Sequence, residues 1–289
     1  MNFRRIEWIF LVAFVVLDVF LVYMFVQTSS SASNTKSSSD TTTTIIREMH
    51  DDNISFSTPS GKENTGYYIA GNNDSGLKAH VSQLANQSTR ILTSGKLTST
   101  LRTTVAIDAD HPEKSLDQFI AQTTNVIHGD QYVYSSALSS SGDYVYVQKV
   151  ADGKILTGTG QIHFTVNKNH QLIGYTQGYL NNVKTLREKA VTISEKKALV
   201  ALYQYNQVSN NSRIVWSKLG YSRLLKLKDS SVYVPTWVFA VRSKNSSNIS
   251  LHRINAFTGA AMKTSSSTGS TDDTSSADAA AAGMIWNAE

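Results

Sequence analysis

The chain has 289 residues, of which 40% are hydrophobic and 17% are charged, and its formal net charge is +5. This composition can fill the core of one or two compact domains. It contains no cysteine, so a fold outside the cytoplasm would have no disulfides and packing alone would stabilise it. Its lysines and arginines are scattered rather than gathered in a basic stripe, which argues against nucleic-acid binding.

An apolar stretch from Trp8 to Val26 follows Arg4 and Arg5 near the start of the chain. A helix of this length, rising about 1.5 Å per residue, covers a hydrocarbon layer of about 30 Å. The two arginines predict a cytoplasmic stub over residues 1–7 and an extracytoplasmic location for the chain after the span. A cleaved signal peptide is the alternative, but its apolar core usually has only about 7–15 residues. We therefore expect a single transmembrane helix over residues 8–26 in the cell membrane.

Asp18 interrupts the apolar pattern near the middle of this predicted span. A carboxyl group at that depth costs about 2.5–3.5 kcal/mol. Either it meets a polar group on another membrane helix, or it is protonated and tolerated by its apolar neighbours, and the sequence does not decide between the two. The residues that share its face form the predicted partner-binding stripe, namely Leu11, Phe14, Val15, Leu21, Val22 and Phe25.

Residues 27–44 are mostly serine and threonine, which predicts a flexible linker. Residues 45–110 combine partial helical spacing from Leu77 to Leu92 with strand-like alternation from Thr100 to Ile107, and we predict a small α+β subdomain there. Residues 264–289 return to low complexity and predict a disordered tail.

Residues 111–263 predict a helix followed by a meander of antiparallel strands, and then the same order again. The first helix is expected to open at the capping box 115–118, burying Phe119, Ile120, Val126 and Ile127. An Asp-Gly turn at residues 152–153 and alternation over 160–176 predict hairpin strands.

In the second unit, the helix is expected to open around Ser194, with strands over 232–241 and 250–262. Residues 166–172 align with 254–260, each an apolar residue and an asparagine before a short turn. Pro235 lacks a ladder donor, which predicts an edge strand or a bulge. The fold class is therefore α+β, with two units sharing a core.

The candidate catalytic and metal-binding patterns are weak. The seven histidines show no zinc spacing, although His163 and His170 are expected on adjacent strand segments. Ser194 and Lys197 match S-x-x-K, but the partner boxes are missing, so Ser194 is interpreted as a helix cap. Residues 158–160 (Gly-Thr-Gly) lead into a strand and are interpreted as a turn or bulge rather than a phosphate loop.

Five aromatic residues could mark a binding surface, but Trp237 on an alternating strand is interpreted as a core residue and the tyrosines as half-buried sheet residues. They are Trp216, Trp237, Tyr144, Tyr146 and Tyr233. We therefore predict that the protein is not an enzyme and has no cofactor, metal site or small-molecule substrate.

Three motifs resemble the YycI (WalI) family: the opening residues 1–11, VYVPTW at 232–237 and INAFTG at 254–259. The resemblance covers about Met1 to Met262. It implies a single-pass accessory regulator of the WalK (YycG) sensor histidine kinase of low-GC Gram-positive bacteria. It also implies an extracytoplasmic fold similar to the related YycH regulators, with PepSY-like helix-and-sheet modules. Asp18 departs from the family pattern, in which we expect an uncharged polar residue near that place.

By this resemblance the partners are a WalK-type kinase and a YycH-type regulator, contacted largely through transmembrane helices. The regulated process is two-component control of cell-wall metabolism. The resemblance does not imply whether this chain activates or inhibits the kinase. The alternative is an anchored envelope module that binds wall polymer or restrains a protease, without a kinase partner.

Overall fold

The computed structural model describes residues 8, 11–22, 35–246 and 248–262. The chain divides into two compact units, Met1–Glu48 and Met49–Glu289. Residues 11–22 are α-helical. Among the described residues, no helix combines the length and the apolar character needed to cross a membrane. The predicted stub, the predicted tail at 264–289, and residues 9, 10 and 23–26 of the predicted span lie outside the described residues.

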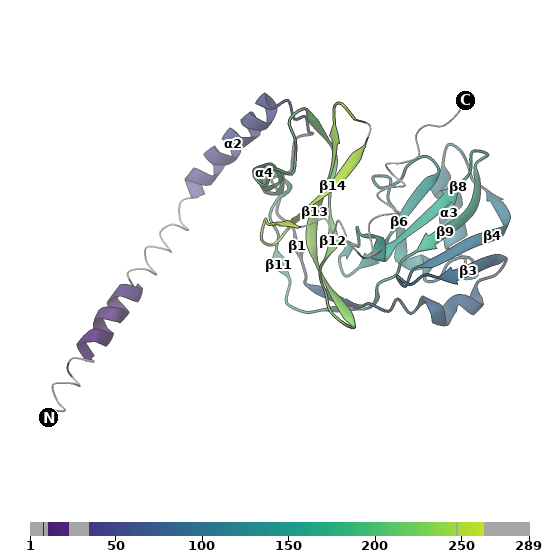
Figure 1. Cartoon of the computed structure of the whole chain (residues 1–289), viewed down its shortest axis with the longest axis horizontal. Helices are drawn as coiled ribbons and strands as arrows, with labels where there is room; N and C mark the ends of the chain where they lie inside the picture. The colour runs from purple at the N-terminus through teal and green to yellow at the C-terminus, as the bar shows by residue number, and fades with distance from the viewer. Residues whose placement is uncertain (1–7, 9–10, 23–34, 247, 263–289) are drawn as a thin grey trace. The chain divides into compact units, whose positions relative to one another are not determined.

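The helix α2 spans Thr35–Asp51 (Figure 1). The flexible linker predicted for residues 27–44 is therefore helical from Thr35 onward, and residues 27–34 lie outside the described part of the chain. Residues 45–49 include Arg, Glu and Met, which favour a helix, and lengthening a helix costs far less than starting one. The Ser/Thr run has weak helix propensity by itself, and the stronger helix formers at residues 45–49 extend the helix over it.

The C-terminal end of α2 is closed by a Schellman motif, in which a residue in the left-handed conformation stops the helix. That residue is Asn53, with φ 59°. Its amide donates to the carbonyl of His50, and the amide of Ile54 donates to the carbonyl of Met49, both at 2.9 Å. Met49 and Ile54 are both fully buried. The end of this helix is therefore fixed in the core of the second unit.

A six-stranded antiparallel sheet is organised around the long strand β13, Ser230–Ser243. β13 pairs with β12 along one edge, and with β2 and then β14 along the other. The predicted strands over 232–241 and 250–262 are confirmed as β13, β14 and β15. The other strands of this sheet are β2 Ile69–Asn72, β10 Asn181–Thr185, β12 Ser212–Lys226, β14 Ile249–Asn255 and β15 Ala261–Met262.

Pro235 lies on this central strand, so the edge or bulge predicted for it is wrong. Its partner across the ladder is Tyr221, whose carbonyl points away from β13 and accepts from the amide of Leu156. Tyr221 and Pro235 are therefore a pair that exchanges no hydrogen bonds. On its other side, Pro235 falls between the end of the β2 ladder and the start of the β14 ladder, where its carbonyl accepts from Ala256. The missing N–H thus breaks neither ladder.

A seven-stranded antiparallel sheet is built from one continuous stretch of chain (Figure 1). Its path is β3-β4-β9-β8-β6-β5, with β7 paired to β6. The predicted Asp-Gly turn is confirmed, because Val150 of β6 pairs with Gly153 of β7. The bounds are β3 Gln87–Ile91, β4 Leu97–Ala106, β5 Tyr132–Tyr134, β6 Asp143–Val150, β7 Gly153–Lys154, β8 Gln161–Val166 and β9 Gln171–Gln177.

This seven-stranded stretch is inserted between two strands of the six-stranded sheet. The chain leaves that sheet at Asn72 and returns to it at Asn181, and these two residues are partners in the ladder between β2 and β10. Residues 45–110, predicted as a separate subdomain, therefore contribute strands to both sheets. A further two-stranded sheet joins β1 Thr65–Gly66 to β11 Ala190–Val191.

The helix α3, Pro112–Ile120, covers one face of the seven-stranded sheet. It begins at Pro112 rather than at the predicted capping box, because proline is preorganised for the first helical position. Ser115 lies inside the helix, and its hydroxyl accepts from the amide of Asp108. The predicted burial of Phe119, Ile120, Val126 and Ile127 is confirmed, although the last two follow the helix.

The helix α4, Glu195–Gln204, opens at Ser194 as predicted, and the Ser194 hydroxyl accepts from the amide of Lys197. The short 3-10 helices are η1 Leu77–Gln83, η2 Gly129–Gln131 and η3 Gly158–Gly160. The helical spacing from Leu77 to Leu92 thus corresponds to η1 followed by β3.

The two sheets meet at β6 of the seven-stranded sheet, with one helix on the far side of each sheet. On β6, Tyr146 lies in the core with α3, whereas its neighbours Val145 and Val147 pack against Val238 of the six-stranded sheet. On β13, the indole nitrogen of Trp237 donates to the carbonyl of Ile193, next to α4. Because alternate residues of a strand face opposite sides, the order at this contact is α4, six-stranded sheet, seven-stranded sheet, α3. This confirms an α+β fold with antiparallel sheets.

Candidate functional site

The predicted partner-binding stripe lies on the helix of residues 11–22. At about 100° per residue, six of its members fall on one side of the helix, with Asp18 near the middle of that side. These members are Leu11, Phe14, Val15, Asp18, Leu21 and Val22. The seventh predicted residue, Phe25, lies outside the described residues.

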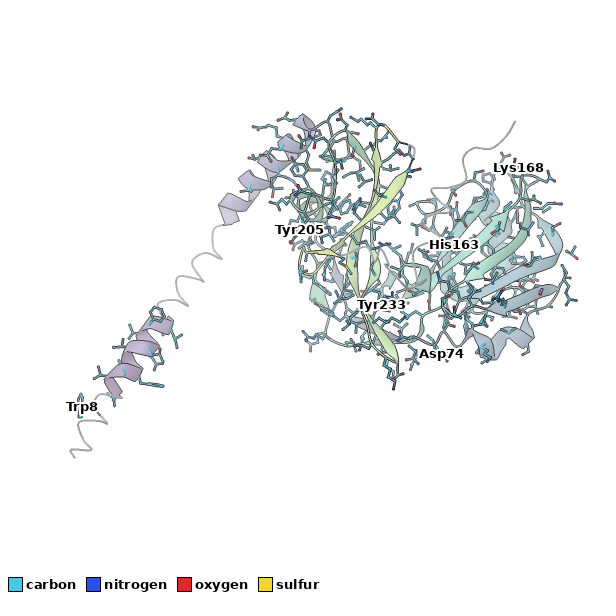
Figure 2. All side chains as sticks on the ribbon, in the orientation of Figure 1. Trp8, Asp74, His163, Lys168, Tyr205 and Tyr233 are labelled. Atoms are coloured by element: carbon cyan, nitrogen blue, oxygen red, sulfur yellow. The ribbon has the colours of Figure 1, made fainter. Side chains whose placement is uncertain are left out.

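This helix is apolar on every side. Asp18 is its single polar residue, and the exposed fractions of its large apolar side chains run from 50% for Val12 to 64% for Val19. Its side chains project from the helix in Figure 2, which also labels Trp8. An all-round apolar helix is stable only when lipid or other protein covers it. Asp18 is therefore the one side chain of residues 11–22 that distinguishes one side of the helix from the others as a site for a partner helix.

The five aromatic residues singled out in the sequence are mainly structural. Trp237, Tyr146 and Tyr233 are buried, while Tyr144 and Trp216 are half-buried. The Tyr146 hydroxyl donates to the Asp117 carboxylate on α3 at 2.7 Å. Burial raises the pKa of Tyr146, and its hydrogen bond to Asp117 adds to the effect. The core position predicted for Trp237 is confirmed; of the tyrosines predicted as half-buried, Tyr144 is half-buried and Tyr146 and Tyr233 are fully buried.

Ser194 and Lys197 do not form a nucleophile pair. The Ser194 hydroxyl caps α4, and the Lys197 ammonium makes an ion pair with Glu63 at 2.9 Å. An S-x-x-K nucleophile requires the lysine beside the serine hydroxyl, so the cap interpretation is confirmed.

The histidines do not gather into a metal-binding group. Among the described residues, no three His, Cys, Asp or Glu side chains are placed to hold a metal ion. His163, labelled in Figure 2, pairs across the ladder with Thr176, whereas His170 lies in the turn after β8 with φ 54°. They are therefore not directly opposite each other.

Two histidine contacts were missed from the sequence. The His163 ring contacts the Asp143 carboxylate through Nδ1 at 3.1 Å and the Gln161 amide oxygen through Nε2 at 3.1 Å. Strand alternation alone could not reveal this, because the contact depends on the register of β6 against β8.

The second contact joins three rings. His128 stacks on Tyr179 with ring centroids 4.7 Å apart, and His80 meets His128 at 5.1 Å. Burial lowers the pKa of His128, and His80 lowers it further, while Asp130 acts against this. These residues come from three distant segments and share no local motif.

Comparison with known proteins decides the family. A family model described as YycI protein matches residues 32–257 of the chain. The chain belongs to the YycI family. YycI proteins are regulatory accessory proteins rather than a known enzyme family, so this YycI chain has a regulatory role in the WalK pathway.

No curated protein matches this YycI chain. Among solved structures, an uncharacterized protein from Eubacterium rectale is similar at 10% identity and a TM-score of 0.41, covering 73% of this chain and 91% of that one. The C-terminal domain of Bacillus megaterium YpeB is similar at 13% identity and a TM-score of 0.32, covering 78% and 95% respectively.

Proposed function

We propose that this chain is a non-enzymatic, single-pass membrane regulator of a WalK-type sensor histidine kinase, with its N-terminus in the cytoplasm and its folded unit outside. The proposal includes a YycH-type partner and control of cell-wall metabolism, as the family resemblance implies. The observation that carries it is the helix of residues 11–22, whose large apolar side chains are exposed on every side of the isolated chain.

Lipid would satisfy the apolar side chains of this helix, but not the Asp18 carboxyl. A polar side chain inside a bilayer is normally matched by a polar group on a neighbouring helix. The apolar residues around Asp18 on the same face would then pack against that helix. The face with Asp18 at its centre is the contact that the proposal assigns to the kinase.

The test is a measurement of helix association in bilayers, with full-length chain and full-length kinase carrying a fluorescence donor and acceptor. Asp18→Leu should weaken association by about 1 kcal/mol, or about fivefold, because one interhelical hydrogen bond is lost. Asp18→Asn should retain most of the association, since the amide keeps both a donor and an acceptor.

Val16→Leu is the matched control, because Val16 lies on nearly the opposite side of the helix and receives the same side chain. Its association should equal that of the unmodified chain. If Asp18→Leu and the unmodified chain associate equally with the kinase, Asp18 does not take part in the contact.

A further inference from the structure

A polar cavity of about 340 Å³ lies where the seven-stranded insertion joins the six-stranded sheet. Its walls come from the loop after β2, the turn between β3 and β4, η3, the segment between β9 and β10, and the strands β12 and β13. Asp74 and Tyr233, both labelled in Figure 2, are among its lining residues. No local sequence motif indicates this cavity, because its walls come from segments far apart in the chain.

Hydrogen bonds hold the walls of this cavity in place. The Asn73 amide donates to the carbonyls of Leu227 at 2.7 Å and Lys228 at 3.1 Å, which ties the loop after β2 to the β12–β13 hairpin. The Ser75 hydroxyl donates to the carbonyl of Gly95 at 2.8 Å, on the turn between β3 and β4. A cavity whose walls are already fixed loses little conformational entropy when it binds a ligand.

The charge of the lining favours an anion. Three cationic side chains line the cavity, Lys96, Arg223 and Lys226, against a single carboxylate, Asp74. Lys96 takes no part in any ion pair among the described residues. Most of the remaining lining residues carry hydroxyl or amide groups, and Leu180 is the one aliphatic side chain among them. Cations select a phosphate, and neutral polar groups suit the hydroxyls of a polyol or sugar.

We propose that this cavity binds a phosphate group carried on a polyol or a sugar. The volume lies at the lower end of the range for small-molecule sites, which fits a headgroup or one unit of a phosphorylated polymer. Polyol phosphate occurs both in soluble polymers and in anionic lipid headgroups. Both sources present the same chemistry to Lys96, Arg223 and Lys226. This binding goes beyond the kinase contact and does not require it.

A second basic cluster provides the control. Arg213 and Arg242 face each other across the β12–β13 ladder at the end far from the cavity. Both arginines are exposed, and like charges opposite each other in a ladder gain nothing from their pairing. Removing them takes away the same amount of charge as removing two cavity cations, without touching the cavity.

The experiment is calorimetric titration of the full-length chain in neutral detergent at low salt. The probes are inorganic phosphate, glycerol 3-phosphate, a poly(glycerol phosphate) oligomer and dibutyryl phosphatidylglycerol. Glycerol 3-phosphate should bind more tightly than inorganic phosphate, because the glycerol hydroxyls add hydrogen bonds.

Lys96→Gln and Lys226→Gln should each weaken the binding of glycerol 3-phosphate about tenfold, the factor expected when one charge-assisted hydrogen bond is lost. Arg213→Gln with Arg242→Gln should leave it unchanged.

Asp74→Asn tests whether the cavity prefers an anion, because it removes the single carboxylate of the lining. The asparagine keeps the carbonyl oxygen that accepts from the amide of Gly76, but removes the negative charge, so anion binding should tighten. Circular dichroism of each variant verifies the fold, and this gain in affinity cannot arise from unfolding. Tighter binding of the oligomer points to a soluble polymer as the source, and tighter binding of the lipid points to a membrane headgroup. No saturable binding of glycerol 3-phosphate, or equal losses in the cavity and control variants, would overturn the proposal.

Discussion

A single asparagine side chain organises each of the two turns within residues 166–172 and 254–260, the segments that align with each other in the sequence. The Asn167 side-chain oxygen accepts from the amides of Asn169 and Gln171, and the Asn255 oxygen accepts from those of Phe257 and Thr258. Each turn ends on a residue in the left-handed conformation, His170 and Gly259 respectively. The two aligned segments, 166–172 and 254–260, therefore share the same kind of turn, in which an asparagine side-chain oxygen accepts from two backbone amides. A repeat of whole units stays a prediction.

At this scale His128 gives a pH prediction. Its pKa in the folded chain lies below the ordinary value of 6.5, so the unfolded chain takes up a proton first as the pH falls. Stability from the neutral imidazole is therefore fully present above about pH 6.5 and is lost as the pH falls through the folded pKa.

NMR titration of the histidine ring protons should show His128 titrating at lower pH in the folded chain than in urea. His128→Gln identifies the signal. A folded midpoint at or above the unfolded one would contradict the assigned burial effect.

Among the elements, those defined by local chemistry were predictable. Ser194 places a side-chain acceptor before the free amides of α4, and an Asp-Gly turn closes β6 on β7. Two other elements depended on context. Pro112 moved the start of α3 ahead of the capping box, and β13 tolerates Pro235 only because two different ladders meet beside it. The cavity cations could not be predicted, because no local spacing relates Lys96 to a hairpin so much later in the chain.

The return of the chain past the end of α3 gives a prediction for Gly129. A Cβ atom there would overlap the backbone carbonyl oxygen of Ile120, the last residue of α3, which cannot move without disrupting the helix. Gly129→Ala should lower the free energy of unfolding by about 2–3 kcal/mol.

Urea unfolding provides the measurement for Gly129→Ala. Gly61→Ala is the matched control, since no atom lies within 4 Å of its added Cβ, and it should change stability by less than about 0.5 kcal/mol. Equal stability of the two variants would show that α3 and η2 can separate at no cost.

On the scale of the whole second unit, the two sheets share the contacts of Val145 and Val147 with Val238. Trp216 packs against the same cluster, and both it and Trp237 belong to the six-stranded sheet. Tryptophan fluorescence therefore reports on one sheet, while circular dichroism reports on both.

Val147→Ala removes a buried side chain from the seven-stranded sheet and should destabilise the unit by about 1–2 kcal/mol. The background carries Trp8→Phe and Trp286→Phe, so that only Trp216 and Trp237 fluoresce. If the sheets unfold together, Val147→Ala shifts the midpoints of the fluorescence and dichroism transitions equally. Val105→Ala, at an exposed position of the same sheet, should shift neither. A tryptophan midpoint unmoved by Val147→Ala would mean that the sheets unfold separately.

The adjacency of Asn72 and Asn181 has a consequence for the order of folding during synthesis. Every strand of the seven-stranded sheet, from β3 to β9, is complete before β12, β13 and β14 are made. That sheet can therefore form first, and as it forms it draws β2 and β10 together. Most of the entropy cost of closing this long loop is then spent before β13 arrives. β13 can then add to an edge of β2 that is already in place, and β14 and β15 complete the six-stranded sheet after it.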